Sequence, residues 1–506
     1  MASLVGDLWR MAKAGVTLAR HDVILPGEYQ ARMPAPARWA GKTLRAFGGG
    51  AKGRPGERLA TALESLGPAY IKLGQFLATR PDVFGVEATQ DLSRLKDKLP
   101  PFSGKAAKDT LETEFGADVA NRMFPDLGPA VAAASIAQVH KIEVAGKTKA
   151  VKILRPGIER QIDQALSAMQ RGAKLVETAS ADSRRLEPVA FTTTVGNAMV
   201  RELDLRLEAG GLDEMGEISR KTGHFIVPQV DWERTGRRVL TMEWLDGVPL
   251  TDPAALSAED IDPVSLANDV TRGFLTHAIV HGVFHADMHE GNLMVLPGNK
   301  LGLLDFGIIG RIGLMERRFL AEILFGFIRR DYTRIAEVHF EAGYVPKDQS
   351  VGQFAQALRS VGEPIHGKEA EDVSMGRLLL QLLDYTHTFG MRLRPELVLL
   401  QKTMVQVEGV ARAIDPGHNI WDAAEPVVEK WVREELGPAG AVKLAARNAR
   451  EVSDRLKRLP DVMDKVEAMI EAGAHQPETD NQRFAPWWGW FGLILGLGAL
   501  AVWGLA

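Results

Sequence analysis

The sequence predicts an α+β protein in which a small β-sheet lies between long helical segments, with an apolar segment near the C-terminal end. Three observations support this prediction. Short β-prone runs occur between residues 130 and 155, amphipathic helical periodicity covers most of the chain on either side, and residues 487–506 carry no charge. At 506 residues, with 45% apolar and 25% charged side chains, the chain is long enough for two or three folded domains.

Charge balance and residue usage exclude several classes of protein. The chain has 61 basic and 65 acidic side chains and a formal net charge of −4, so no overall positive field indicates a nucleic-acid partner. It has no cysteine, which excludes disulfides, thiolate nucleophiles and cysteine-ligated zinc. Partners therefore have to be inferred from individual sites.

Residues 1–115 are expected to form a helical N-terminal extension. Apolar side chains recur there at helical spacing, and glycine- or proline-rich stretches at 47–57 and 99–104 interrupt them. The first helix is amphipathic, and its charged residues exclude a signal peptide. We favour its packing against the folded body over an alternative in which it lies on a membrane or on another protein.

Residues 116–242 are expected to hold the sheet and a helical insertion. "SIAQVHKIEV" and "TKAVKIL" are β-prone runs joined by "AGK", which predicts a hairpin with a tight turn. Two or three helices are expected between residues 158 and 220. "RRVLTMEWLDGVPL" at 237–250 then predicts a strand that leads into a polar turn.

The rest of the chain is expected to contain a helical unit, a linker and a membrane anchor. Residues 243–470 are mostly helical in pattern, and residues 471–486 are polar and aperiodic. Residues 487–506, "WWGWFGLILGLGALAVWGLA", would span the ~30 Å hydrocarbon core of a bilayer at ~1.5 Å per residue. This predicts a single-pass transmembrane tail anchor in the inner (cytoplasmic) membrane, with the body facing the cytoplasm. A buried core helix is the alternative.

The strongest chemical signal lies in "VFHADMHEGNLMV", residues 283–295. Asn292 follows Asp287 by five residues, and "LGLLDFGIIG" then places Asp305 after a second short strand. A phosphoryl-transfer site needs one carboxylate to orient or deprotonate the nucleophile, plus an amide and a second carboxylate to hold Mg²⁺. The order and spacing match the protein-kinase pattern. We therefore predict a bilobal protein-kinase-like fold that binds ATP and Mg²⁺, with Asn292 and Asp305 as metal ligands.

A kinase-like site also needs a strand lysine and a loop that covers the phosphates. "AVKIL" supplies Lys152 for the phosphates. In place of a glycine-rich turn the chain has "AVAAASIAQVH", with Ala132, Ala133, Ala134 and Ser135 before the strand. Alanine adopts positive φ only at a cost, so this loop should be stiff and hold phosphates in a different pose. The Ser135 hydroxyl is expected to be available to a phosphate.

Six segments together resemble the UbiB family, also called the ADCK family, of atypical protein-kinase-like proteins. The resemblance covers roughly residues 60–420. It implies a bilobal kinase-like fold, ATP and Mg²⁺ binding, and a supporting role in ubiquinone (coenzyme Q) biosynthesis at a membrane. Bacterial members often have two predicted spans, so one span or two stays open here. The segments are "YIKLGQFLATRPDVF" (70–84), "AAASIAQVH" (132–140), "AVKILRPGI" (150–158), "ELDLRLEA" (202–209), "HADMHEGN" (285–292) and "LLDFG" (303–307).

The resemblance assigns regulatory residues. Lys72, Gly74 and Gln75 match the family's K-x-G-Q motif, and Glu202 and Asp204 match its E-x-D motif. In the family these motifs face each other across the active site and occlude the place where a protein substrate would dock. The resemblance therefore implies that Lys72 meets these carboxylates.

Three further assignments complete the expected site. Glu208 lies one helical turn after Asp204, so we favour it as the partner of Lys152, with Glu202 as the alternative. His289 is either a neighbour of the metal or a packing residue of the loop. The strand between the lobes should offer backbone groups to adenine at "EWLD", that is, at Glu243, Trp244, Leu245 and Asp246.

The reaction stays open among three interpretations. After Asp305-Phe306-Gly307 the pattern becomes helical almost at once, without an activation segment or an A-P-E triplet, so phosphorylation of proteins is not expected. We favour ATP hydrolysis that serves lipid-like quinone intermediates; phosphorylation of a small or lipid-like acceptor and a nucleotide-switched scaffold without turnover are the alternatives. Expected partners are membrane lipids, quinone-biosynthesis intermediates and the enzymes that handle them, and a homodimer stays open.

Overall fold

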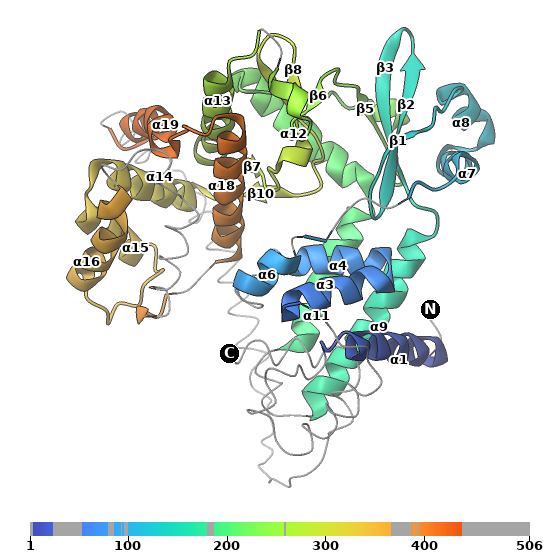
Figure 1. Ribbon diagram of the computed structural model, residues 1–506, viewed down its shortest axis with the longest axis horizontal. Helices are drawn as coiled ribbons and strands as arrows, with labels where there is room; N and C mark the ends of the chain where they lie inside the picture. The colour runs from blue at the N-terminus through green and yellow to red at the C-terminus, as the bar shows by residue number, and fades with distance from the viewer. Residues whose placement is uncertain are drawn as a thin grey trace, which may run out of the picture.

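The β-prone region forms an antiparallel sheet with the strand order β1-β2-β3-β5 (Figure 1). The hairpin between β2 and β3 turns at Ala145 and Gly146, which both have positive φ, as a two-residue type I′ turn requires. The strands are β1 Ala130–Ala133, β2 Ala137–Val144, β3 Lys147–Leu154 and β5 Val239–Glu243. The computed structural model describes residues 4–23, 53–78, 86–92, 94–95, 100–179, 187–257, 260–365, 385, 388–391 and 394–437.

Two helices, α7 Gly104–Phe115 and α8 Ala117–Met123, cover one face of this sheet. Leu111 and Phe124 pack there against Ile142 and Ile153, so the strands bury one face against the helices. We call this sheet with α7 and α8 the N-lobe. The sequence had assigned α7 to the N-terminal extension, and the boundaries predicted at residues 115, 242 and 470 stay predictions.

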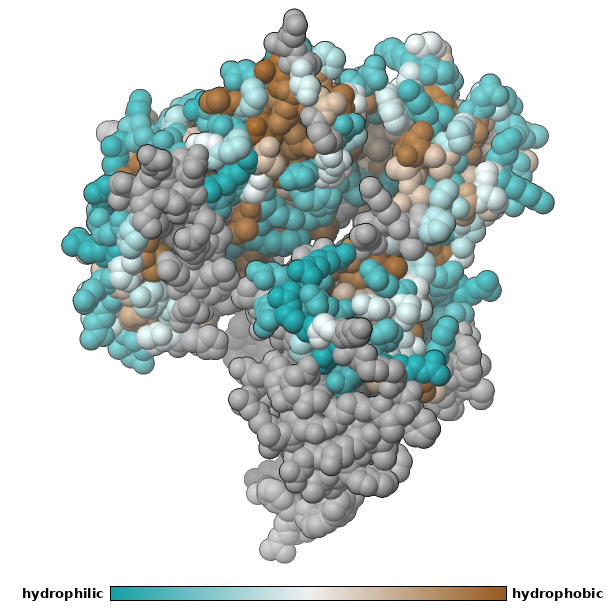
Figure 2. Space-filling view, in the orientation of Figure 1, coloured by the Kyte–Doolittle hydropathy of each residue, from teal (hydrophilic) through white to brown (hydrophobic). Residues whose placement is uncertain are grey.

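A helical body lies beneath the N-lobe in Figure 1. Its core joins helices from the start of the chain to the insertion between β3 and β5, with Leu63, Leu73 and Leu77 packed among Ile162 and Met199. The outer faces of α3 and α6 are largely polar in Figure 2. The helices are α1 Leu4–Arg20, α3 Pro55–Leu66, α4 Pro68–Ala78, α6 Val86–Leu92, α9 Ile158–Ala179 and α11 Pro188–Glu202.

The C-terminal unit, the C-lobe, contains two small sheets that the sequence did not separate from its helices. One has the order β4-β9-β8-β6, and β10 pairs with β7 in the other. The sequence predicts short strands in this region, before Asp305 for example, but it does not show how they pair, because the short runs do not alternate apolar and polar residues. The strands are β4 Phe225–Ile226, β6 Val248–Pro249, β7 Val283–His285, β8 Leu293–Leu296, β9 Lys300–Leu303 and β10 Ile309–Arg311.

Helices form the rest of the C-lobe, and α13 packs against both α18 and α19. Apolar side chains gather over β6 and β8 in Figure 2. The helices are α12 Leu205–Thr222, α13 Pro263–Leu275, α14 Leu314–Arg329, α15 Tyr332–Glu341, α16 Val351–Gly362, α18 Pro395–Ile414 and α19 Ile420–Glu435. Shorter turns are the π-helical η4 Thr276–His281 and the 3₁₀ turns η2 Trp232–Arg234, η3 Pro253–Leu256, η5 Glu290–Asn292 and η6 Glu363–Ile365.

The predicted membrane anchor has to be corrected. In the part of the chain that the structure describes, no helix combines the length and the apolar character needed to cross a bilayer. Even α9, with 22 residues, carries Asp163, Arg171 and Lys174 along its length. This finding overturns the predicted localisation as a single-pass tail anchor in the inner membrane. The linker and anchor had been assigned to 471–486 and 487–506, which lie outside the described residues.

Candidate active site

The site is built around Lys152 on β3. Its Nζ lies 2.6 Å from Glu208 Oε1 and 3.4 Å from Asp305 Oδ1. Lys152 and Glu208 are largely buried, whereas half of the Asp305 side chain is exposed. Strand, helix and loop therefore contribute one charged group each to the same point.

Helix α12 holds Glu208 in place because it belongs to two cores at once. Leu205 and Ala209 pack with the N-terminal helices, and Leu212 and Met215 pack in the C-lobe. Glu208 lies in the first turn, between Leu205 and Ala209. The carboxylate is thus positioned relative to both the helical body and the C-lobe.

Mutual charge stabilisation decides the ionisation of the three groups. Burial lowers the pKa of Lys152, but the charges of Asp305 and Glu208 outweigh it and hold the pKa above its usual value. The Lys152 charge lowers the pKa of Asp305 to about 2. Burial raises the pKa of Glu208, against the pull of Lys152. Lys152 and Asp305 are therefore both charged at neutral pH.

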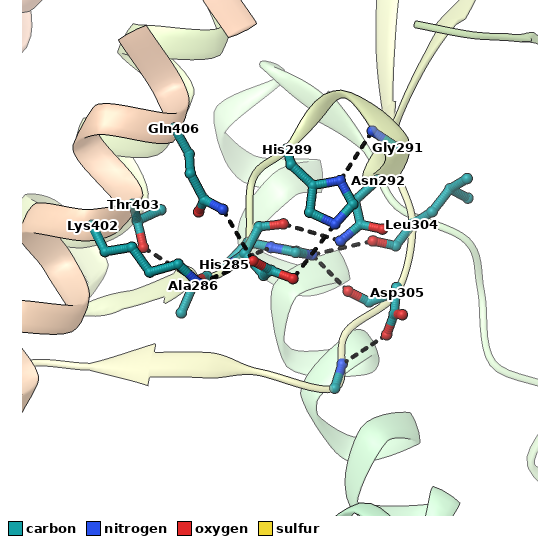
Figure 3. Close-up of polar contacts among 12 residues, drawn as sticks. His285, Ala286, His289, Gly291, Asn292, Leu304, Asp305, Lys402, Thr403 and Gln406 are labelled. Carbon is teal, nitrogen blue, oxygen red and sulfur yellow. Dashed lines mark hydrogen bonds and ion pairs between the residues drawn. The ribbon is translucent and has the colours of Figure 1, made fainter. Parts of the chain in front are cut away.

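The loop after β7 is tied to Asp305 through His285 (Figure 3). The Asp287 amide donates to His285 Nδ1 at 3.2 Å, and the opposite ring nitrogen donates to the Asp305 carbonyl at 2.7 Å. Burial lowers the pKa of His285, in keeping with a neutral ring that accepts at one nitrogen and donates at the other. Asn292 Nδ2 donates to the Asp287 carbonyl at 3.0 Å, which closes the loop.

Asp287 is surrounded by donors. Its carboxylate lies 3.5 Å from His289 Nε2 and 3.3 Å from Lys402 Nζ, and Gln406 Nε2 donates to it at 3.1 Å. Burial alone would raise the pKa of Asp287, but the hydrogen bond to His289 and the Lys402 charge hold it well below its usual range. Asp287 is therefore an ionised, oriented acceptor.

The His289 side chain points toward Asp287. The Gly291 amide donates to His289 Nδ1 at 3.0 Å, so Nε2 carries the proton that faces Asp287. The hydrogen bond to Asp287 raises the pKa of His289. The side chain is half exposed and serves as a partner of Asp287 in this structure.

Asn292 and Asp305 meet at one end of the β8–β9 ladder. The Leu304 amide donates to the Asn292 carbonyl at 2.8 Å, which brings the two predicted metal ligands together. Asp305 adopts a φ of 54°, an unfavourable conformation for a residue with a Cβ, and accepts from the Gly307 amide at 3.2 Å. Backbone strain of this kind is typical of functional sites.

The donor set fits Mg²⁺ bound together with a phosphate. Within the described residues no group of three or more His, Asp or Glu side chains is arranged for a metal ion. Mg²⁺ usually takes only one or two protein carboxylates and fills its shell with phosphate oxygens and water. An ionised, half-exposed Asp305 beside Asn292 provides this kind of partial site.

The helix that carries the K-x-G-Q motif, α4, faces this centre. Lys72 Nζ lies 2.6 Å from Glu202 Oε2, and the Lys72 charge also lowers the pKa of Asp305, after the larger effect of Lys152. A Cβ at Gly74 would overlap Leu95 Cδ1. Gly74 therefore permits close packing of α4. The next residue, Gln75, is partly buried.

The two acidic residues of the E-x-D motif have separate tasks. Glu202 ends α11 and meets Lys72, whereas Asp204 is the N-cap of α12 and accepts from the Arg206 amide at 3.2 Å. The Asp204 carboxylate also pairs with the Arg206 guanidinium at 2.6 Å, which lowers its pKa. Asp204 thus stabilises the first turn of the helix that carries Glu208.

The alanine-rich loop differs from its expected role at one residue. Ala132 and Ala133 end β1, and the Ala134 carbonyl accepts from Arg155 Nε at 3.1 Å. The Ser135 side chain is only 1% exposed, so its hydroxyl is buried in this conformation instead of being presented to a phosphate.

In the segment between the lobes, some backbone amides are already used in hydrogen bonds within the protein. The Glu243 amide donates to the Gln229 carbonyl at 2.9 Å, and the Trp244 amide donates to the Thr148 carbonyl at 3.2 Å. Leu245 is buried against Met294 and Leu296, and Asp246 is exposed. Of the predicted adenine-contacting stretch, Leu245 and Asp246 are the residues whose amides are not needed for these two bonds.

Sequence reasoning missed three site residues on α18. Lys402 and Gln406 reach Asp287, and Thr403 Oγ1 donates to the Ala286 carbonyl at 3.2 Å (Figure 3). The signal available in "LLQKTMVQVEG" was weak: Lys402 and Gln406 are four residues apart and share one helix face. Nothing local connects that face with a loop 115 residues earlier.

These features define a class. The site contains a strand lysine paired with a helix glutamate, followed along the chain by an aspartate, an asparagine and the D-F-G aspartate. This combination defines a protein-kinase-like site within a protein-kinase-like fold.

Comparisons with known proteins identify the family. Residues 94–339 match the ABC1 atypical kinase-like domain, and residues 358–419 match the UbiB helical domain. A protein named "Probable protein kinase UbiB" from Marinobacter nauticus is 35% identical over 434 residues, which cover 85% of this chain and 79% of the relative. Proteins of the same name are 36% identical in Pseudomonas putida and 35% identical in Aeromonas hydrophila, and these alignments cover 89% and 92% of this chain and 83% and 85% of the relatives.

The chain belongs to the UbiB family of ABC1 atypical kinase-like proteins. Membership supports the general class of an atypical kinase or ATPase in ubiquinone biosynthesis. A solved structure of a Mycobacterium tuberculosis protein, Rv3197 in complex with erythromycin, matches with a TM-score of 0.52 and 24% identity and covers 73% of this chain and 94% of that one. This likeness supports the fold.

Proposed function

We propose that this protein is a Mg²⁺-dependent ATPase of the atypical kinase type that supports ubiquinone (coenzyme Q) biosynthesis by acting on lipid-like quinone intermediates or on the enzymes that handle them. The observation that carries the proposal is the convergence of three charged groups: Lys152 Nζ lies 2.6 Å from Glu208 and 3.4 Å from Asp305. The loop of Asp287 and Asn292 lies beside them.

The charged groups suit a nucleotide bound between the lobes. Lys152 would exchange part of its contact with Asp305 for a phosphate oxygen, and Glu208 would keep its ammonium oriented. Asn292 and Asp305 would hold Mg²⁺, which neutralises charge on the phosphates. The backbone at Leu245 and Asp246 would contact adenine.

Asp287 would orient the attacking oxygen. Its pKa lies far below neutrality, so it accepts a hydrogen bond from the nucleophile without storing a proton. This suffices for phosphoryl transfer through a loose transition state, in which little proton transfer precedes bond cleavage. Positioning and charge stabilisation then supply most of the rate acceleration.

Water or a small acceptor is favoured over a protein substrate. After Gly307 the chain enters β10 at Ile309, which pairs with β7, and α14 begins at Leu314. Few residues are left to form a platform for a peptide. Helix α4 would also obstruct a peptide, because Lys72 is close enough for its charge to lower the pKa of Asp305.

The test is phosphate release from Mg-ATP by the purified full chain, with and without detergent-dispersed isoprenoid lipid and a phenolic quinone-precursor mimic. Asp305→Asn serves as the blank because it removes a proposed metal ligand. We expect turnover above the blank that rises with the lipid or the phenol. Turnover equal to the blank, with Mg-ADP still bound, would instead favour a nucleotide-switched scaffold.

The biosynthetic assignment has its own test. Deleting the gene should lower the cellular ubiquinone content measured by mass spectrometry, and the wild-type gene should restore it while the Asp305→Asn allele should not. Unchanged quinone content in the deletion strain would remove this assignment and leave the nucleotide site in place.

A further inference from the structure

Helix α18 contributes a second group of side chains to the catalytic loop, as Figure 3 shows. Lys402 Nζ lies 3.3 Å from Asp287 Oδ1, and Gln406 Nε2 donates to the same oxygen at 3.1 Å. Thr403 is fully buried, and its hydroxyl shares its proton between the Leu399 carbonyl at 2.8 Å and the Ala286 carbonyl at 3.2 Å. Three contacts from one helix to two adjacent residues make α18 part of the site's construction.

The lysines around the site have different ion-pair partners. Lys152 is held between Glu208 and Asp305, and Lys72 meets Glu202. Lys402 instead lies against Asp287, the carboxylate that would orient the nucleophile, and its side chain is 28% exposed. A positive charge is therefore already placed where the transferred phosphoryl group would pass.

The neighbouring histidine does not supply this charge. His289 accepts from the Gly291 amide at Nδ1, which requires that nitrogen to be unprotonated. A neutral ring that donates through Nε2 to Asp287 cannot also act as a cation toward the phosphoryl oxygens. Lys402 is the ammonium that α18 places on the same carboxylate.

Gln406 is the second α18 side chain that holds Asp287. Its Nε2 is bonded to Asp287, while its Oε1 is buried and has no hydrogen-bond partner among the described residues. A buried acceptor without a donor is costly. Gln406 therefore fixes the Asp287 carboxylate through its NH₂ group alone.

We propose that Lys402 is a catalytic residue that contacts the oxygens of the transferred phosphoryl group, and that α18 therefore completes the active site. Lysine suits this task because its flexible stem and three donors allow it to keep one contact with Asp287 while another donor reaches a phosphoryl oxygen. Gln406 is a positioning residue that acts through Asp287.

The inference rests on the proposed function and deepens it. In the hydrolysis step, the bond from the γ-phosphorus to its bridging oxygen breaks with its electron pair left on ADP. The water oxygen forms the new bond to phosphorus, and one water proton passes to solvent or to phosphate. Lys402 stabilises the charge on the transferring oxygens. Because α18 lies in the region that matches the UbiB helical domain, this domain is an integral part of catalysis.

The experiment compares Lys402→Met and Lys402→Arg in the full chain. Lys402→Met should lower kcat for phosphate release roughly 100-fold, as expected when one transition-state donor is removed, while the Kd for Mg-ADP changes less than about threefold. Lys402→Arg keeps the charge and should recover a measurable part of kcat. The matched control is Lys430→Met, an exposed lysine on α19, which should behave as wild type.

A binding measurement separates catalysis from structure. Mg-ADP with aluminium fluoride mimics the transferring phosphoryl group, so Lys402→Met should weaken its calorimetric Kd by about the same factor as kcat, and that of Mg-ADP should not follow. A purely structural role would lower the melting temperature and weaken both ligands alike. If Lys402→Met does not fold, Lys402→Gln is measured instead, with the same expectations.

The outcomes distinguish the inference from the proposed function. A wild-type chain that binds and hydrolyses Mg-ATP, with Lys402→Met turning over within about threefold of it, overturns the role of Lys402 only. A folded wild-type chain that does not bind Mg-ADP overturns the proposed function, and the role of Lys402 with it.

Discussion

Lys152 is the residue at which the two lobes meet. Its ammonium contacts Glu208 on α12 and Asp305 in the loop after β9, so one side chain joins segments that lie 56 and 153 positions away from it. Burial opposes the charge, but the two carboxylates keep the Lys152 pKa above its usual value. The ammonium therefore stays charged at physiological pH.

Replacing Glu208 with Gln tests this arrangement. The change removes one of the two charges that hold Lys152, so we expect the Mg-ADP affinity to fall about tenfold. We also expect the free energy of unfolding to fall by about 1–3 kcal/mol, because a buried ammonium loses part of its compensation. Calorimetric titration and urea unfolding measure these two effects.

The control for Glu208→Gln lies on the same helix. Glu214 pairs with Arg311 at 2.5 Å on the exposed side of α12. Glu214→Gln should therefore cost no more than about 1 kcal/mol and leave the nucleotide affinity unchanged. Wild-type affinity in Glu208→Gln would show that Lys152 does not depend on this partner.

At the scale of elements, helix α4 depends on the absence of a side chain at Gly74. A Cβ there would overlap Leu95 and approach Leu63 Cδ1 to 2.8 Å, and both leucines are buried. We expect Gly74→Ala to lower the free energy of unfolding by about 1–3 kcal/mol through overpacking and to displace Lys72 from Glu202. Urea unfolding measures the loss of stability.

Gly210 on α12 provides the matched control for Gly74→Ala. It is exposed, and an added Cβ would meet no heavy atom within 4 Å. Gly210→Ala should raise the free energy of unfolding by about 0.5–1 kcal/mol because alanine favours the helix. Equal effects at both positions would contradict the packing argument.

The turn of the β2–β3 hairpin contains a strained residue, Ala145, and a substitution there should relieve the strain. Ala145 has a φ of 50°, which costs an alanine roughly 1 kcal/mol and a glycine almost nothing. We expect Ala145→Gly to raise the free energy of unfolding by a few tenths to about 1 kcal/mol in urea titrations. A loss of stability would mean that the turn does not keep this conformation in solution.

At the scale of the whole molecule, buried neutral histidines link stability to pH. Burial lowers the pKa of His339 to about 4 and that of His277 to about 3. An unfolded imidazole titrates near 6.5, so folding is favoured at a pH above that value. Because the folded pKa is depressed, this stability is lost as the pH falls from 6.5 toward the folded pKa.

For His339 the difference corresponds to about 3 kcal/mol. We expect the urea midpoint to fall steeply between about pH 6.5 and pH 4, and His339→Phe to flatten this dependence, since the ring contacts Tyr344 and Phe354 and would keep them. Equal slopes in the wild type and in His339→Phe would contradict the assignment to this residue.

Much of the site could be predicted because its motifs are local. The "AGK" turn predicts the β2–β3 hairpin, and the five-residue interval from Asp287 to Asn292 is the length of one loop closed by a single hydrogen bond. Residue spacing also favoured Glu208 over Glu202 as the partner of Lys152, and the structure contains that contact. The roles of these residues toward a nucleotide stay predictions.

Other features depend on packing that no local pattern encodes. Asp204 and Glu202 are two residues apart, yet one caps α12 and the other meets Lys72, because the chain changes direction between two helices. The burial of Ser135 and the contacts of Lys402 with Asp287 likewise arise where distant segments meet.

The sequence by itself determined the family, the order of the catalytic motifs and the residues that each strand and loop presents, because turn chemistry and residue spacing act over a few positions. Only the tertiary structure decided that α18 reaches Asp287, that Lys152 and Asp305 share one centre, and that Ser135 is buried. The physical reason is that burial and close packing are collective. They depend on which surfaces meet in the folded chain. The sequence of one segment does not show which distant segment will pack against it.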